Sequence, residues 1–362
     1  MARDTDRDEA SFGRGFLTDA WYFAAMSREV RRGRLQRLEI LGEPVLLGRS
    51  PDGALFALYD ICPHRAAPLS GGRFAREADG RPSVECPYHG WRFGSDGRCA
   101  AIPSLVPGQD LDVSRIRVRA YPIAESQGMV FIFVPGGRRR EVEAPVPPPR
   151  FPDIANSVSR IVERRTFSAH IDHAIVGLMD PAHGPHVHQQ WWWRSRRSAH
   201  EKAKDFGPSH EGFTMLRHAP SSNSRAYAAL GGAPQTEITF RLPAFRWEHV
   251  TVGRRQVLAL TCLTPANDRE TRISQIIWSD HPIIRIAEPF VRLAARRFLE
   301  QDGRMVDLQN EGLRYDPSLI WIDDADTQAR WYQALKREWL ASRREGRAFV
   351  NPVQPTTLRW TS

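Results

Sequence analysis

The sequence predicts a two-domain protein of the α+β class, with an all-β domain first and then a domain of helices and an antiparallel sheet. At 362 residues the chain is long for one core and comfortable for two. Short β-like runs separated by turn residues occupy residues 18–135. A proline-rich stretch, APVPPPRFPDI at 144–154, follows, and prolines at that density suit neither a helix nor a sheet interior. We therefore expect domains at 1–143 and 155–362 with a linker at 144–154.

The elements can be justified in chain order. VLLGRSPDGALFALYD reads as a strand, a Pro-Asp-Gly turn and a second strand, and GMVFIFVPGG closes the first domain. In the second domain we expect a helical stretch around 168–188, β-like runs between 236 and 280, and amphipathic helices near 284–311 and 324–343. Residues 196–235 contain few apolar runs, which predicts a long loop.

Composition restricts the function classes. The net charge is +9, but the basic residues are nearly all arginines scattered along the chain, without interleaved aromatics or a nucleic-acid motif. This favours a solvated face or a dock for an acidic protein partner over nucleic acid. The apolar runs are strand-sized and the charged start lacks the apolar core of a signal peptide, so we expect no membrane span and a cytoplasmic, bacterial protein. Four cysteines then suggest ligation rather than disulfides.

Two short motifs in the first domain pair a cysteine with a histidine. Cys62 and His64 form C-x-H, and Cys86 and His89 form C-x2-H. Two loops that each present two ligands can build one four-ligand site, although buried cysteines and surface histidines would give the same letters. Zinc ribbons usually show C-x2-C pairs. One Cys and one His from each loop suits a [2Fe-2S] cluster with two cysteines on one iron and two histidines on the other.

A second group of potential ligands lies in DHAIVGLMDPAHGPHVH, where His173, Asp180, His183, His186 and His188 fall within seventeen residues. Iron(II) that must bind oxygen usually has two histidines and one carboxylate on one face and open positions opposite. His183 and His188 suit the end of a helix distorted by nearby prolines and glycine. His186 and His173 are the weaker candidates, and polar surface neighbours are the plain alternative.

The flanking letters resemble a known family. CPHRAAPLS and CPYHGWRFGSDGRC match the Rieske pattern, and Ala67 and Tyr88 stand where respiratory Rieske proteins carry disulfide cysteines. DPAHGPHVH is similar to the D-x2-H-x4-H motif of Rieske-type non-heme iron aromatic ring-hydroxylating oxygenases, α subunit. The resemblance implies a helix-grip catalytic domain and an Fe(II) site of His183, His188 and Asp302 from LEQDGRMVDLQNEG. Asp307 is the competing carboxylate.

The resemblance also implies roles around these ligands. Asp180 would bridge an iron-ligating histidine of its own chain and a Rieske histidine of the neighbouring chain. Many relatives have Asn at the position of Gly177, so a polar role there is absent or passes to another residue, such as His173. Trp191, Trp192 and Trp193 either wall a substrate pocket together with these residues or pack in a core or interface.

The expected activity is that of a terminal oxygenase with O2 as co-substrate, acting by hydroxylation or demethylation on an aromatic or other hydrophobic small molecule. The chain shows no flavin or nicotinamide fingerprint, so electrons from NAD(P)H would arrive through a separate ferredoxin or flavin-containing reductase. Head-to-tail homotrimers are implied. The rival interpretation is a Rieske electron carrier or redox sensor with an inactive second domain, and the weakest is a nucleic-acid-binding zinc protein.

Overall fold

The computed structural model describes residues 11–137, 143–153, 159–188, 196–222 and 225–362. The chain forms two compact units: residues 18–150, and residues 151–362 together with the segment before residue 18. The described N-terminal residues 11–17 therefore belong to the larger unit, although the sequence placed them with the β domain. In the described part of the chain, no helix has the length and apolar character needed to cross a membrane.

The smaller unit consists of three antiparallel sheets and short 3-10 turns. Its strands, in sheet order, are β1 (Ala20–Met26), β11 (Met129–Val134) and β10 (Ile123–Ser126); β2 (Arg34–Ile40), β3 (Glu43–Arg49), β4 (Leu55–Tyr59) and β9 (Ala120–Tyr121); β5 (Arg73–Arg76), β6 (Pro82–Glu85), β7 (Arg92–Phe93) and β8 (Cys99–Ala101). The predicted turn at Pro51–Gly53 connects β3 to β4. The β5–β8 sheet packs around a core that includes Cys62 and Cys86.

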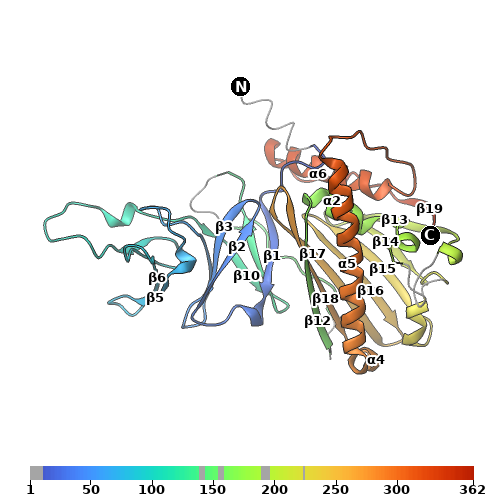
Figure 1. Ribbon diagram of the computed structural model, residues 1–362, viewed down its shortest axis with the longest axis horizontal. Coiled ribbons are helices and arrows are strands. Elements are labelled where there is room, and N and C mark those ends of the chain that lie inside the picture. The colour runs from blue at the N-terminus through green and yellow to red at the C-terminus, as the bar shows by residue number, and fades with distance from the viewer. Residues whose placement is uncertain (1–10, 138–142, 154–158, 189–195, 223–224) are drawn as a thin grey trace. The chain divides into compact units, whose positions relative to one another are not determined.

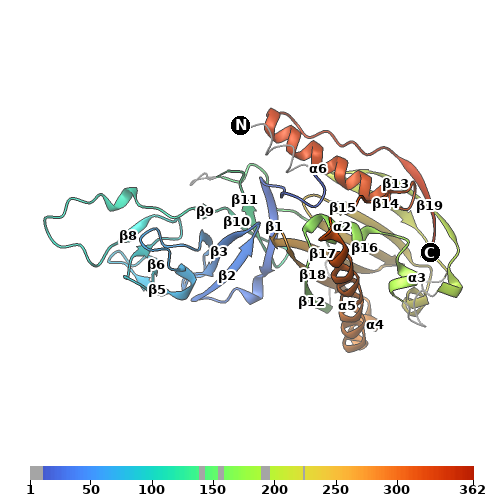
Figure 2. The same cartoon turned by 45° about the horizontal axis from the view of Figure 1, so that its top comes forward.

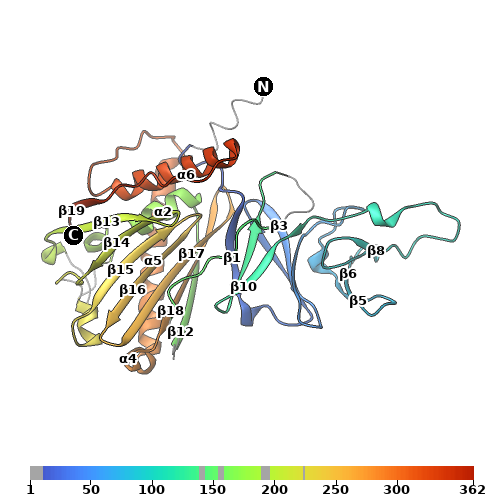
Figure 3. The ribbon, with the colours of Figure 1, turned by 180° about the vertical axis from the view of Figure 1, so that it is seen from behind.

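The larger unit is built on one eight-stranded antiparallel sheet. In sheet order its strands are β12 (Ser159–Phe167), β18 (Glu270–Ser279), β17 (Arg255–Asn267), β16 (Phe245–Val252), β15 (Gln235–Arg241), β14 (Gly212–His218), β13 (Glu201–Ser209) and β19 (Thr356–Thr361). Most consecutive strands pair with each other, whereas β12 and β19 come from distant parts of the sequence. The view from behind shows this sheet in front of the helix that crosses it (Figure 3).

That crossing helix is α5 (Glu288–Leu313), which follows the short α4 (Pro282–Ile286). Its buried positions, Ala295, Leu299, Gly303 and Val306, recur at three and four residues and so form one face. The helix itself runs along the sheet (Figure 1). At Gly303 the helix approaches β12 so closely that a Cβ would lie 2.1 Å from Nε of Arg165. A glycine there lets α5 pack directly on the sheet.

Two further helices complete the unit. These are α2 (Ile171–Met179) and α6 (Thr327–Glu345) (Figure 2). α2 ends where Asp180 is followed by Pro181, and α6 ends at Gly346 in the left-handed conformation. The two helices are joined by a buried Asp172–Lys336 ion pair, Nζ to Oδ2 2.7 Å. The same lysine donates to the carbonyl of Arg14 at 2.6 Å, which fastens the N-terminal segment to this unit.

The predicted loop over residues 196–235 is wrong. That stretch contains β13, β14 and a 3-10 turn, Arg225–Leu230, together with connecting segments. β13 contains few apolar residues. Its register comes from pairing with the C-terminal strand β19, from Glu201↔Thr361 to Phe206↔Thr356. Two of its residues, Lys202 and Lys204, are polar because they line a cavity. The strand β19 itself was also missed, since a six-residue edge strand after a helix has no strong local signal.

Candidate metal centres and the adjoining cavity

The β domain presents its four predicted cluster ligands on two loops that share one backbone pattern. The N–H of Cys62 donates to the carbonyl of Ala67 at 2.9 Å, and the N–H of Cys86 donates to that of Trp91 at 2.8 Å. In each loop the cysteine carbonyl accepts from the residue four positions on, Ala66 or Gly90. Both of those residues have positive φ, 58° and 70°. Each cysteine and its histidine are therefore held on a tight, hydrogen-bonded loop.

The side chains of these loops suit a cluster chemically. Cys62 and Cys86 are buried free thiols, and burial, with Cys86 as a neighbour, raises the pKa of Cys62 to about 11. The rings of His64 and His89 lie 4.4 Å apart. Nδ1 of His64 is buried and has no hydrogen-bond partner among the described residues. A metal ion would give that nitrogen its missing partner and would deprotonate the thiols.

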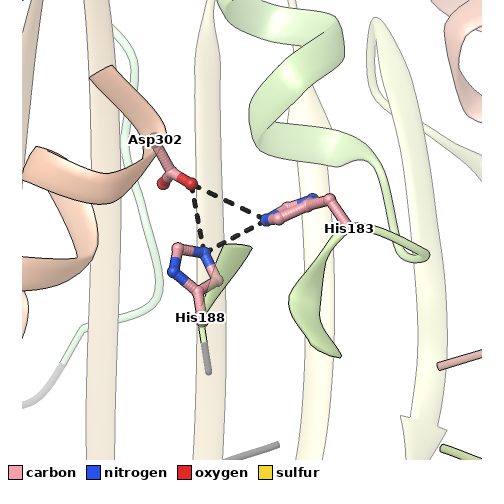
Figure 4. A group of neighbouring side chains, drawn as sticks. All are labelled: His183, His188 and Asp302. Carbon is pink, nitrogen blue, oxygen red and sulfur yellow. Dashed lines mark hydrogen bonds and ion pairs between the residues drawn. The ribbon is translucent and has the colours of Figure 1, made fainter. Parts of the chain in front are cut away.

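The second centre is formed by the helical segment after α2 and by α5. His183 and His188 lie immediately before and after a one-turn helix, α3 (Gly184–Val187), with Pro185 near its start. Asp302 comes from α5, beside the buried face of that helix. Figure 4 shows the three side chains pointing toward one another.

The distances at this centre match a single metal ion. Nε2 of His183 lies 3.1 Å from Nε2 of His188, and Oδ1 of Asp302 lies 3.1 Å from His188 Nε2 and 3.7 Å from His183 Nε2. Two ligands at right angles, each about 2.1 Å from a metal ion, lie about 3 Å apart. Burial lowers the pKa of His183. The neutral imidazole that a metal requires is therefore the favoured form.

The other ring nitrogens of the two histidines have different surroundings. Nδ1 of His183 is buried without a hydrogen-bond partner among the described residues, and it lies 3.7 Å from Oδ2 of Asp180, whose Oδ1 accepts from the N–H of Ala182 at 2.7 Å. Nδ1 of His188 is 3.0 Å from Oε1 of Gln301. The acceptor at Nδ1 of His188 favours the tautomer that leaves Nε2 free for a metal ion. Gln301 was missed from the sequence, because no spacing motif marks an amide beside a candidate ligand.

A cavity of about 360 Å³ adjoins the metal centre. It lies against the sheet, and its walls include both histidines, Asp302, Asp180 and apolar residues of α5 such as Phe298 and Leu299. An apolar groove of about 800 Å³ shares some of its lining, including Tyr227, Ile277 and Val291. A small molecule of mostly apolar surface could therefore reach the open side of the metal centre.

The structure places the predicted pocket residues in different surroundings. His173 does not line the cavity: its ring packs edge-on against Phe12 at 4.7 Å, because α2 turns this position toward the N-terminal segment. Gly177 is exposed on α2, and a Cβ there would meet nothing within 4 Å. Trp191, Trp192 and Trp193 lie outside the described residues.

The two competing ligands lie outside the three-residue group. His186 is exposed on α3, and it is not part of the described cluster of His183, His188 and Asp302. Asp307 lies further along α5 and is 3.9 Å from Arg165, the distance joining Oδ2 to Nη2.

Comparison with known proteins identifies a domain family and a shared fold. Residues 20–122 match the Rieske [2Fe-2S] domain family. The fold of the chain matches a solved structure titled dicamba monooxygenase bound to dicamba, with a TM-score of 0.68, 21% identity and coverage of 89% of this chain and 98% of that one. The first unit therefore contains a match to the Rieske [2Fe-2S] domain family, and the chain shares its overall fold with this monooxygenase structure.

Particular relatives can then be named. Dicamba O-demethylase, oxygenase component, of Stenotrophomonas maltophilia is 34% identical over 178 residues, which is 48% of this chain and 48% of that protein. The 3-chlorobenzoate-3,4-dioxygenase oxygenase subunit of Comamonas testosteroni is 36% identical over 36% of this chain and 29% of its own length. The chain thus spans about half or less of the length of these curated relatives. In this chain, residues 20–122 match a domain family that holds a [2Fe-2S] cluster, and His183, His188 and Asp302 form a group that could hold a metal ion.

Proposed function

We propose that the protein is the terminal oxygenase component of a multicomponent Rieske system. With O2 and electrons from a separate ferredoxin or flavin-containing reductase, it would hydroxylate or demethylate an aromatic or other hydrophobic small molecule in a bacterial cytoplasm. The observation that carries the proposal is the convergence of His183, His188 and Asp302 beside a cavity, in a chain that also contains a match to the Rieske domain family. An electron carrier would need no substrate cavity at a second metal site.

In the proposed mechanism the cofactors supply the redox chemistry, and the chain holds the cofactors and the substrate. When bound, the cluster supplies electrons singly and the iron supplies oxygen activation. His183, His188 and Asp302 would hold the iron, and the adjoining cavity would hold the substrate beside it. The apolar walls exclude bulk water and hold the substrate there.

Asp180 would connect the two centres. Its Oδ2 faces Nδ1 of His183, and its Oδ1 is fixed by the N–H of Ala182, so the carboxylate has a defined orientation. Its side chain is about one-third exposed, 33%. We propose that this exposed part accepts a hydrogen bond from a Rieske histidine of a neighbouring copy in a head-to-tail trimer, which would couple the centres through one carboxylate.

Metal analysis with electron paramagnetic resonance tests the function. The purified protein should contain about three iron atoms and two acid-labile sulfides per chain, and the dithionite-reduced form should give a Rieske signal. His183→Ala should retain the Rieske signal, lose about one iron per chain and lose oxygen uptake. His186→Ala, a change three residues away at an exposed histidine, should keep all three properties.

Oxygen uptake should be measured with methoxylated, polycyclic and quaternary-amine compounds as the panel. Uptake with at least one of them, abolished by His183→Ala, is the expected result. A zinc-loaded protein without the Rieske signal would refute the proposal. Full iron content with no substrate-dependent uptake across the panel would favour the rival electron carrier or sensor.

A further inference from the structure

The charged side chains that line the cavity are unevenly distributed in sign. Apart from Asp180 and Asp302, which belong to the metal centre, the described lining contains three cations, Lys202, Lys204 and Arg246, and one carboxylate, Glu248. A bound iron would add further positive charge. A cavity with this balance favours a ligand that carries negative charge.

Arg246 lies at one end of a polar row on the sheet. It is opposite Thr261 in the β16–β17 register, and Thr261 is opposite Gln275 in the β17–β18 register. All three residues line the cavity, so their side chains project from the same face of the sheet. The next row along the strands contains the apolar side chains of Ile277, Ala259 and Ile238 and the carboxylate of Glu248. The sheet face therefore offers a polar strip beside a mainly apolar row.

The other charged groups of the cavity are already engaged by the protein. Glu248 accepts from the hydroxyl groups of Tyr227 and Thr236, the latter at 3.1 Å. Nζ of Lys202 donates to Oγ of Ser362 at 2.9 Å, and Nζ of Lys204 donates to the carbonyl of Ala219 at 3.2 Å. The side chain of Arg246 has no hydrogen bond or ion pair with any described residue, although it is partly buried.

An arginine in this position is costly unless something pairs with it. Partly buried cations normally find a carboxylate or several carbonyl oxygens, because removal from water is otherwise uncompensated. The guanidinium is planar and presents paired N–H groups that match the oxygens of a carboxylate or a sulfonate. An anionic oxygen group that enters the cavity would therefore suit the side chain of Arg246.

We propose that Arg246 is the specificity-determining residue of the substrate site and that the substrate is an aromatic acid, with a carboxylate or sulfonate group on Arg246 and its ring toward the metal centre. The inference rests on the proposed function and deepens it. A cavity of about 360 Å³ holds one or two rings with a small polar group, since a 150 Å³ cavity is enough for about one benzene. The apolar row and Phe298 pack against the ring, and Arg246 sets its orientation.

The test measures binding without turnover. The holoenzyme is titrated anaerobically by calorimetry with benzoate, benzenesulfonate and 2-naphthoate, and with the neutral amides benzamide and 2-naphthamide. We expect at least one acid to bind about tenfold or more tightly than its matched amide, as a charge-assisted bidentate pair provides. In Arg246→Gln that ratio should fall to about one, and in Arg246→Lys it should be intermediate because the charge remains and the fork is lost.

The matched control is Arg217→Gln, which removes an exposed arginine from β14 of the same sheet, and it should leave the ratio unchanged. The Rieske signal and the thermal midpoint of each variant show whether it is folded. Equal or absent binding of acids and amides in the wild type, or a ratio that survives in Arg246→Gln and Arg246→Lys, overturns the inference. Because no turnover is involved, loss of oxygen uptake and loss of acid preference are separate results.

Discussion

Among single residues, Gln301 orients the imidazole of His188, because its Oε1 is the acceptor for Nδ1 of His188 at 3.0 Å. Removing that acceptor frees the imidazole to rotate and to exchange its tautomer. An amide differs from a carboxylate here, since it orients the ring without adding a negative charge beside the metal. The residue is thus a positioning residue, and its effect should appear in the metal content before it appears in the fold.

Gln301→Leu should lower iron affinity or activity by about ten- to a hundredfold, the usual cost of losing such a partner. Gln301→Glu keeps an acceptor and should retain iron. The measurement is the iron content after dialysis against a weak chelator, with the Rieske signal as the measure of an intact β domain. Gln309→Leu removes a glutamine from the exposed side of the same helix and serves as the control. Equal iron retention in both leucine variants would show that Gln301 has no such role.

Among the elements, α2 depends on contacts that lie far from it in the sequence. Asp172 in its first turn is fully buried and accepts from Nζ of Lys336 at 2.7 Å, from the hydroxyl of Tyr332 at 2.5 Å and from the N–H of Gly13 at 2.8 Å. Lys336 and Tyr332 are one turn apart on α6. The network fixes α2, whose last residue is followed by Asp180 and the histidine ligands.

Lys336→Met should destabilise the protein by about 3–5 kcal/mol, because Asp172 would remain charged and buried without its partner. Adding Asp172→Asn should restore part of that loss, since the double variant leaves no unpaired charge. Thermal unfolding of the single and double variants measures the effect. Arg337→Met, at the adjacent exposed position of α6, should change stability by less than about 0.5 kcal/mol. A double variant as unstable as the sum of its single changes would contradict the pairing argument.

At the scale of the whole molecule, the sequence predicted those parts whose signals are local. The loop motifs at Cys62 and Cys86, the prolines around His183 and the amphipathic pattern of α5 each lie within a short window. What it missed depends on long-range pairing: β13 takes its register from β19, and His173 is directed away from the cavity by Phe12. Arg246 was also missed, because its place in the cavity follows from the registers of β16, β17 and β18.

The two centres of one chain lie in separate compact units, which raises the question of which cluster serves which iron. If electrons pass to the neighbouring copy of a closed ring, as we propose, a chain that lacks its cluster can still use the iron it holds. Two inactive chains with complementary defects should then restore activity when they assemble together. Transfer within one chain cannot give this result.

The prediction is tested by co-expressing His89→Ala, which removes a predicted cluster ligand, with His183→Ala, each variant carrying a different affinity tag. Each variant alone should be inactive, and randomly mixed assemblies should recover about one quarter of the wild-type oxygen uptake, since half the chains hold iron and half of their neighbours hold a cluster. Wild type co-expressed with the double variant should also give about one quarter by the neighbour route, but about one half if transfer stays within a chain. Mixing the two variants after separate purification shows whether subunits exchange. No recovery with complementary variants, together with one half in the second mixture, would place electron transfer inside the single chain and would remove the need for Asp180 to meet a neighbour.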